Sequence, residues 1–122
     1  MIAFTKANLN STKDLDALAD ILQSAFLDEY KREDNERFYR LKRATVYFIL
    51  HEGERIGTFT LRNIMDYVGL SSFAIKPKYQ GKGYGREVIY TLLDQYPNLA
   101  VIDLPRDTLV SSIYKGLPIL YR

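Results

Sequence analysis

The hydrophobic positions near the start of the chain repeat with the period of a helix. Apolar residues recur every three or four positions, as Leu15, Leu18, Ala19, Leu22, Ala25 and Phe26. This spacing gathers them on one face, which predicts an amphipathic helix that ends near Tyr30. Asn10, Ser11 and Thr12 supply helix-capping residues, and Asp14 follows Ser11 by three positions in a relative of the capping box.

A second amphipathic pattern runs from about Gly83 to Gln95. Its apolar face consists of Val88, Ile89, Leu92 and Leu93. Pro97 and Asn98 follow directly and predict the end of this helix, because proline cannot continue it. Further on, Asp107 is expected to cap a last helix that runs through Tyr114.

Short apolar runs rich in β-branched and aromatic residues predict strands. They are Met1–Ala7, Thr45–Leu50, Arg55–Leu61, Asp66–Ile75 and Leu99–Ile102, with Leu117–Tyr121 as a final short strand. Glu52-Gly53-Glu54 forms a turn that makes a hairpin of the second and third runs. Pro77 ends the run before it, because proline cannot donate to a sheet ladder.

The segment Asp28–Arg37 is almost entirely charged, with both signs mixed. We interpret it as a solvated helix end and loop. The alternative is that it forms the rim of an acceptor pocket.

The order of elements predicts an α/β (α+β) fold. An antiparallel meander leads into a strand-helix-strand unit, so a mixed central sheet with helices on both faces is expected. With 122 residues and no linker, repeat or low-complexity stretch, residues 1–122 are expected to form a single domain.

Composition excludes several kinds of function. The chain has no cysteine and one histidine, His51, so thiolate or multi-histidine metal sites are ruled out and no metal is expected. A net charge of +2, with acids interleaved among the bases, does not indicate a nucleic-acid partner. No apolar run reaches the length of a membrane span and no signal-peptide pattern opens the chain, so no membrane partner and a cytoplasmic location are expected.

Three glycines alternate where a strand gives way to a helix: Gly81, Gly83 and Gly85. The first N–H groups of a helix have no intrahelical partner, and the helix dipole makes that end partly positive. A glycine-lined approach lets an anion come close to them, and Lys82 and Arg86 add positive charge, so the expected ligand is a phosphate or pyrophosphate. A glycine-rich turn without a ligand is the alternative.

The glycines do not complete either of two familiar phosphate motifs. The dinucleotide fingerprint requires a further glycine where Arg86 stands, and the Walker motif requires a Gly-Lys-Ser/Thr ending that is missing. The whole stretch Phe73–Arg86 instead resembles the central motif of the GNAT N-acetyltransferases, in which proline is followed by Gln/Arg-x-x-Gly-x-Gly/Ala. Gln80, Gly83 and Gly85 occupy the three marked positions.

The resemblance extends over about Val68–Tyr114, because Asp107 and Tyr114 have the seven-residue spacing of the family's downstream cap and tyrosine. It implies that acetyl-CoA is the co-substrate and that its pantetheine arm lies along the edge of the strand at Phe73, Ala74 and Ile75. It also implies that the following residues bind the cofactor, chiefly its pyrophosphate: Gln80, Gly81, Lys82, Gly83, Tyr84, Gly85, Arg86 and Asp107. The strand Leu99–Ile102 would splay away from the preceding strand, with the acetyl thioester in the opening.

The activity that the resemblance implies is acetyl transfer to an amine of a small molecule or protein. Tyr114 matches the tyrosine that often protonates the leaving thiolate. Asp66 and Asp103 are candidate general bases, although both are equally well explained as turn residues. Ser71 and Ser72 could hold a water relay. We expect His51 to lie on the surface and the ring of Tyr84 only to pack.

Two departures from the family pattern bear on the acceptor site. Family members usually have two more strands after the last helix, where this sequence has room for one and contains Pro118. A partner subunit that supplies the missing wall would make the protein a homodimer. The same departure suggests an alternative function, a non-catalytic binding or regulatory module that keeps the fold. A third class, a nucleic-acid binder, would use Lys76, Lys78, Lys82 and Arg86.

Overall fold

The computed structural model describes residues 1–26, 31–41, 43–102 and 117–118, and the account that follows concerns these residues. The described elements are one strand, two helices, three consecutive strands, a helix and a last strand. In order, they are β1 (Ile2–Lys6), α1 (Thr12–Phe26), α2 (Arg32–Leu41), β2 (Thr45–His51), β3 (Glu54–Ile64), β4 (Tyr67–Ile75), a short 3-10 turn (Pro77–Tyr79), α3 (Tyr84–Gln95) and β5 (Leu99–Val101).

The five strands form one sheet in sequence order, β1-β2-β3-β4-β5. The first four pair antiparallel, and β5 joins β4 in parallel after the chain has crossed through α3. A parallel pair needs such a crossover, because the chain must return to the same end of the sheet. The expected meander followed by a strand-helix-strand unit is therefore confirmed.

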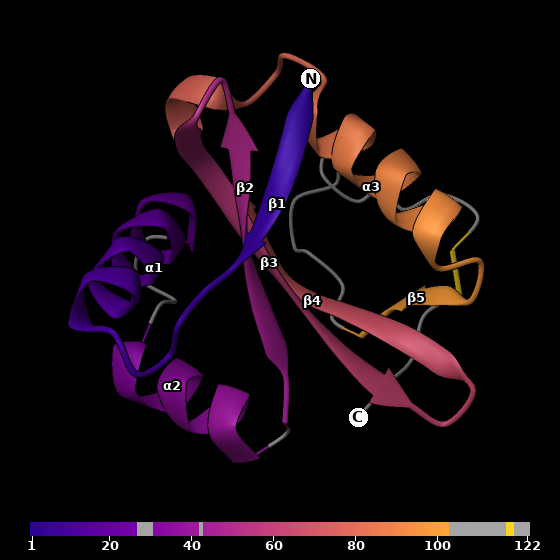
Figure 1. Cartoon of the computed structure of the whole chain (residues 1–122), viewed down its shortest axis with the longest axis horizontal. Coiled ribbons are helices and arrows are strands. Elements are labelled where there is room, and N and C mark those ends of the chain that lie inside the picture. Colours follow the sequence, from indigo (N-terminus) through magenta and orange to yellow (C-terminus); the bar gives the residue numbers. More distant parts are fainter. Residues whose placement is uncertain (27–30, 42, 103–116, 119–122) are drawn as a thin grey trace.

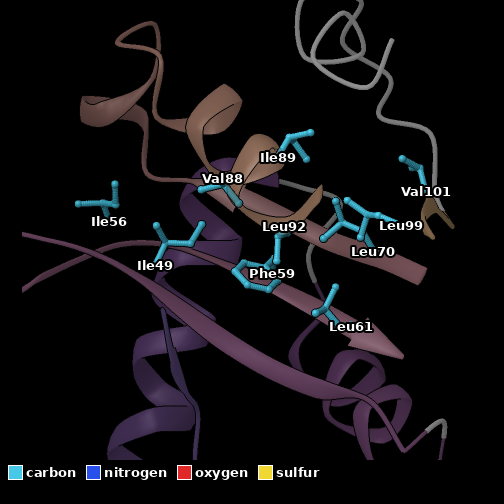
Figure 2. Close-up of a cluster of buried hydrophobic side chains, with 10 residues drawn as sticks. All are labelled: Ile49, Ile56, Phe59, Leu61, Leu70, Val88, Ile89, Leu92, Leu99 and Val101. Carbon is cyan, nitrogen blue, oxygen red and sulfur yellow. The ribbon is translucent and has the colours of Figure 1, made fainter. Parts of the chain in front are cut away.

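Helices cover both faces of the sheet, as expected. Figure 1 shows α1 and α2 on one side and α3 on the other. The two faces hold separate hydrophobic clusters, one under α3 around Phe59, Leu70 and Leu92, and one under α1 and α2 around Leu22 and Phe48. In Figure 2 the side chains of α3 point down onto those of β3 and β4. Burial of these apolar residues is what fixes α3 and its N-terminus against the sheet.

The charged segment is organised differently from our interpretation. Residues 28–30 lie outside the described part, but Arg32–Leu41 is the helix α2, where a loop was predicted. Acidic residues stand in its first turn and Arg40 in its last, which matches the helix dipole. Arg32 bonds Glu36 one turn later at 2.9 Å and Asp16 of α1 at 2.9 Å, and Tyr39 is buried at 3% exposure. The loop interpretation was wrong because a helix of mostly charged residues, held by ion pairs and one buried ring, has few apolar residues to reveal its period.

The start of α1 follows the predicted capping pattern with one change. The backbone N–H of Asp14 donates to Oγ of Ser11 at 3.4 Å. The Asp14 carboxylate accepts from the backbone N–H of Asn8 at 2.7 Å and from Arg55 at 3.0 Å. The cap therefore also connects α1 to the beginning of β3.

The strand β4 changes its pairing half-way along. Val68, Gly69 and Leu70 pair with β3 on one side and with β5 on the other, and the N–H of Ile102 donates to the carbonyl of Leu70 at 2.9 Å. Beyond Leu70 the described residues pair with β4 only on its β3 side, so β4 and the described part of β5 diverge there. A β-bulge opposite Thr58–Thr60 coincides with this point, and Ser72 within it has a left-handed φ of 50°.

The last two predicted elements fall largely outside the described part of the chain. This applies to the helix from Asp107 to Tyr114 and to residues 119–121 of the final strand. Pro118 is described, and its carbonyl accepts from the N–H of Val101 at 2.8 Å, next to β5. No helix within the described ranges is long and apolar enough to cross a membrane.

Candidate functional site

The glycine loop between β4 and α3 has the backbone that its sequence predicts. Gly81 and Gly83 have φ values of +74° and +87°, in the left-handed region that residues with a side chain rarely adopt. A Cβ built on either glycine would meet no atom within 4 Å. The space beside the loop is therefore open. Because the two glycines have no side chain, a ligand in that space can approach the backbone closely.

The start of α3 presents its first amides to this space. Gly83 is the N-cap and offers no side-chain cap, and the first helical hydrogen bond runs from the N–H of Glu87 to the carbonyl of Gly83 at 3.1 Å. The N–H groups of Tyr84, Gly85 and Arg86 precede that bond, so they have no partner within the helix. This is the arrangement that binds phosphate groups at helix N-termini.

Two cationic side chains flank the open amides. Lys82 and Arg86 are exposed, and neither forms an ion pair within the described ranges. Their charge remains available to an anion at the loop. Glu87 contributes the one acidic side chain of the first turn.

The loop is fixed to its surroundings on both sides of the glycines. Before them, Nε2 of Gln80 donates to the carbonyl of Ile75 at 2.8 Å, which ties the loop to the end of β4. After them, the ring of Tyr84 packs against that of His51 with centroids 4.8 Å apart. His51, expected on the surface, is in fact half-buried at the end of β2 and is part of this support.

The diverging half of β4 leads from the sheet to the loop. Phe73 and Ile75 pack toward the α3 face, whereas Ala74 is buried in the cluster beneath α1. The bulge explains this order, because its extra residue shifts the alternation of side chains by one position. The N–H of Lys76 donates to Ile56 of β3 at 2.8 Å, so the neighbouring Ile75 directs its backbone groups away from β3.

Two buried hydroxyl groups lie opposite each other where the strands diverge. Thr60 and Ser71 are paired in register and are 0% and 3% exposed. Neither hydroxyl oxygen has a hydrogen-bond partner among the described residues. Thr60 also pairs with Val46, whose side chain packs beneath α1 and α2, so the two hydroxyls belong to that face of the sheet. Buried hydroxyls without a partner are uncommon and frequently mark a position for water or for a functional group.

Of the candidate catalytic residues, only Asp66 lies in the described part of the chain. Asp66 is exposed at the turn before β4, and its carbonyl accepts from Nδ2 of Asn98 at 2.8 Å. Leu70 lies four positions after Asp66, or about 13 Å further along the chain. Asp103, Asp107 and Tyr114 lie outside the described residues.

A half-open cavity of about 300 Å³ lies away from the loop, at the C-terminal end of α3. Phe4, Tyr47, Phe59 and Tyr96 contribute rings to its lining. Burial raises the pKa of Tyr47, and the neighbouring Tyr96 raises it further, so the Tyr47 phenol stays protonated at neutral pH. The described ranges contain no group of three or more His, Cys, Asp or Glu side chains placed to hold a metal ion.

Comparison with known proteins agrees with this geometry. Residues 15–108 match the family model described as the acetyltransferase (GNAT) family. No curated protein sequence matches the chain significantly.

Several solved structures resemble this fold over nearly its whole length. The ribosomal-protein-S18-alanine N-acetyltransferase from Escherichia coli has a TM-score of 0.73 at 19% identity, over 95% of this chain and 76% of that one. A Bacillus subtilis acetyltransferase in complex with CoA has a TM-score of 0.70 at 19% identity, over 94% and 74%. A GNAT family acetyltransferase from Elizabethkingia anophelis with acetyl-CoA bound has a TM-score of 0.66 at 17% identity, over 93% and 72%.

Proposed function

Because the chain belongs to the GNAT acetyltransferase family, we propose that it moves the acetyl group of acetyl-CoA to a primary amine of a small molecule or a protein. Family membership identifies it as an N-acetyltransferase. We further propose which residues contact the co-substrate, and that residues 1–122 form one acyltransferase domain.

One observation carries the proposal. The unpaired amides at the start of α3 lie beside two left-handed glycines with nothing within 4 Å of where a side chain would be. A diphosphate fits this place because it can accept several backbone hydrogen bonds at a positive helix end. We assign it to the loop Gln80–Arg86, with Lys82 and Arg86 as counter-charges.

The one-sided half of β4 supports a site for the pantetheine arm. Beyond Leu70 no residue of the described ranges pairs with the strand on the β5 side, and an extended amide-containing chain can add to such an edge. We assign this edge to Phe73, Ala74 and Ile75. The distance along β4 from Leu70 to the loop then sets where the thioester lies, close to the point at which β4 and β5 diverge.

The chemistry requires a neutral amine, a donor for the developing oxyanion and a proton for the leaving thiolate. We propose that the buried hydroxyls of Ser71 and Thr60 hold water that accepts the proton of the amine. Asp66 and Asp103 remain the candidate bases at the end of that route. Tyr114 is proposed to protonate the thiolate, and Asp107 to cap the helix that carries it, both on the basis of the sequence motif.

The test is a turnover assay with acetyl-CoA and a panel of amines that includes amino acids, polyamines and peptides with free N-termini. Release of free CoA thiol in the presence of one class of amine would identify the acceptor. Calorimetry with acetyl-CoA should show binding in the absence of any amine. Binding without transfer to any amine would contradict catalysis and favour a non-catalytic module.

A further inference from the structure

The tip of the β2–β3 hairpin lies against the glycine loop. β2 ends at His51 and β3 begins at Glu54, with Glu52 and Gly53 between them at φ values of 52° and 81°. Two consecutive left-handed residues form the tight two-residue turn that suits the twist of paired strands. The turn therefore fixes both His51 and Glu54 at the end of a rigid hairpin.

This tip contacts the loop on both sides of its glycines. The hydroxyl of Tyr79, two residues before Gly81, donates a hydrogen bond to the carboxylate of Glu54. The ring of Tyr84, directly after Gly83, packs on His51. The rings of Tyr79 and Tyr84 also meet, with centroids 6.3 Å apart and an angle of 69° between them.

A carboxylate beside an anion-binding loop requires an explanation, because it repels the ligand that the loop would bind. The surroundings offset its charge. The ammonium of Lys78 lies 5.0 Å from the ring centroid of Tyr79. The Tyr79 hydroxyl holds the pKa of Glu54 below its ordinary value, and Lys78, Lys76 and His51 lower it further. Glu54 is thus ionised, and its carboxylate accepts the hydrogen bond that holds Tyr79 in place.

The glycines make the loop accessible, and they also increase the conformational entropy that the loop loses when it becomes ordered. Gly81 and Gly83 carry no side chain that could restrict the backbone, so the loop depends on its flanks to present its amides in one geometry. A loop held in its binding geometry beforehand loses less entropy when the ligand binds. Besides the backbone bonds of the 3-10 turn, the Glu54–Tyr79 hydrogen bond and the Gln80–Ile75 bond are side-chain contacts that anchor the side before the glycines.

We propose that Glu54 and Tyr79 are positioning residues, which hold the glycine loop in the geometry that binds the diphosphate of acetyl-CoA. This inference rests on the proposed function. Glu54 contacts neither the ligand nor the reacting atoms; it acts through Tyr79 on the amides that follow. The sequence motif contains neither residue at a marked position, so the motif itself does not predict this support.

The experiment compares acetyl-CoA affinity by calorimetry in wild type, Tyr79→Phe, Glu54→Ala and the double variant. Each single change should weaken binding about 3- to 10-fold, the effect of one partly exposed charged hydrogen bond. The double variant should be no weaker than either single variant, because both remove the same contact. Glu54→Gln should restore most of the affinity, since its amide oxygen can still accept from Tyr79. Tyr90→Phe, which removes the hydroxyl of an exposed tyrosine on α3, is the matched control and should bind like wild type.

Two further measurements separate positioning from general stability. The turnover number at saturating acetyl-CoA should be unchanged in Tyr79→Phe while KM rises, and the melting temperature without ligand should fall only slightly relative to Tyr90→Phe, because the Tyr79–Glu54 bond is exposed. Wild-type affinity in both single variants, or additive losses in the double variant, would overturn the inference while leaving the proposed function intact. Failure of the wild type itself to bind acetyl-CoA would instead overturn the proposed function, and the inference with it.

Discussion

The two halves of β4 belong to one strand but have different surroundings. Val68–Leu70 is held by neighbours on both edges, and Leu70 is 1% exposed in the core. Ser71–Ile75 has, among the described residues, a neighbour only on the β3 edge, contains a left-handed residue and leads into the glycine loop. The first half has the strand contacts of an interior strand, and the second is the edge that we propose for the ligand. One strand can thus serve both the core and a proposed binding edge when its pairing on one side ends early.

The largest difference between the halves should appear in stability. Leu70→Ala removes a buried side chain from the doubly paired half, and we expect it to lower the free energy of unfolding by about 2–5 kcal/mol. Ile75→Ala, in the one-sided half, is only partly buried and should cost less than half as much. Urea denaturation of both variants measures this. Equal losses would show that the two halves contribute alike to the core.

The next effect concerns the loop at the end of the one-sided half. Gly83→Leu places a side chain in the open space beside the amides, and we expect acetyl-CoA affinity to fall by roughly 100-fold through loss of one or two charged hydrogen bonds. Gly53→Leu is the control, because its φ of +81° and empty surroundings match those of Gly83. Both variants should lose about 1–2 kcal/mol of stability from the left-handed backbone. Calorimetry that finds equal affinity in the two variants would argue against a diphosphate at the loop.

A smaller and purely kinetic effect is expected at Tyr114. If the thioester lies where β4 and β5 diverge, Tyr114→Phe removes the proposed proton donor to the thiolate. The turnover number should fall roughly 10- to 100-fold, toward the lower range for general acid catalysis, while acetyl-CoA affinity changes little. Steady-state kinetics beside Tyr90→Phe provide the measurement. An unaltered turnover number would remove Tyr114 from the mechanism.

The smallest effect is a pH dependence of the support beneath the loop. The pKa of Glu54 is lowered in the folded protein, first by the Tyr79 hydroxyl and then by Lys78 and other cations. The unfolded chain therefore binds a proton more readily, so the contribution of Glu54 to stability is complete above its ordinary pKa and is lost as pH falls through the lowered value. Melting temperatures of wild type and Glu54→Gln should differ at neutral pH and converge in acid. A difference that persists in acid would mean that ionisation of Glu54 is not involved.

Much of this architecture was predictable because it depends on local patterns. Pro77, the alternating glycines and the apolar face of α3 are each read within a few residues, and they place the loop correctly. The helix α2 was missed because its stability comes from Arg32 and its partners in two helices. The sequence does contain a signal for the bulge. Large apolar residues stand at positions 68 and 70 and then at 73 and 75, so the alternation of apolar side chains shifts by one residue within the strand.

The support from the hairpin could not be predicted in this way. Glu54 and Tyr79 are 25 positions apart, and no local spacing indicates that they meet. His51 likewise gives no sign in the sequence that its ring packs on Tyr84. These contacts arise only once the β2–β3 turn and the start of α3 have been brought to the same end of the sheet.

The parallel pairing of β4 with β5 has a consequence for how the protein is made. The two hairpins pair close neighbours in sequence, whereas β4 pairs with β5 across 31 positions and β1 pairs with β2 across 41 to 49 positions. Contacts between distant parts of a chain form slowly, so we expect the β2-β3-β4 meander to form first and both edge strands, β5 among them, to dock afterwards. Most of the secondary structure of a newly synthesised molecule would then form before the proposed thioester site between β4 and β5. Binding of acetyl-CoA during folding would therefore indicate that folding is complete.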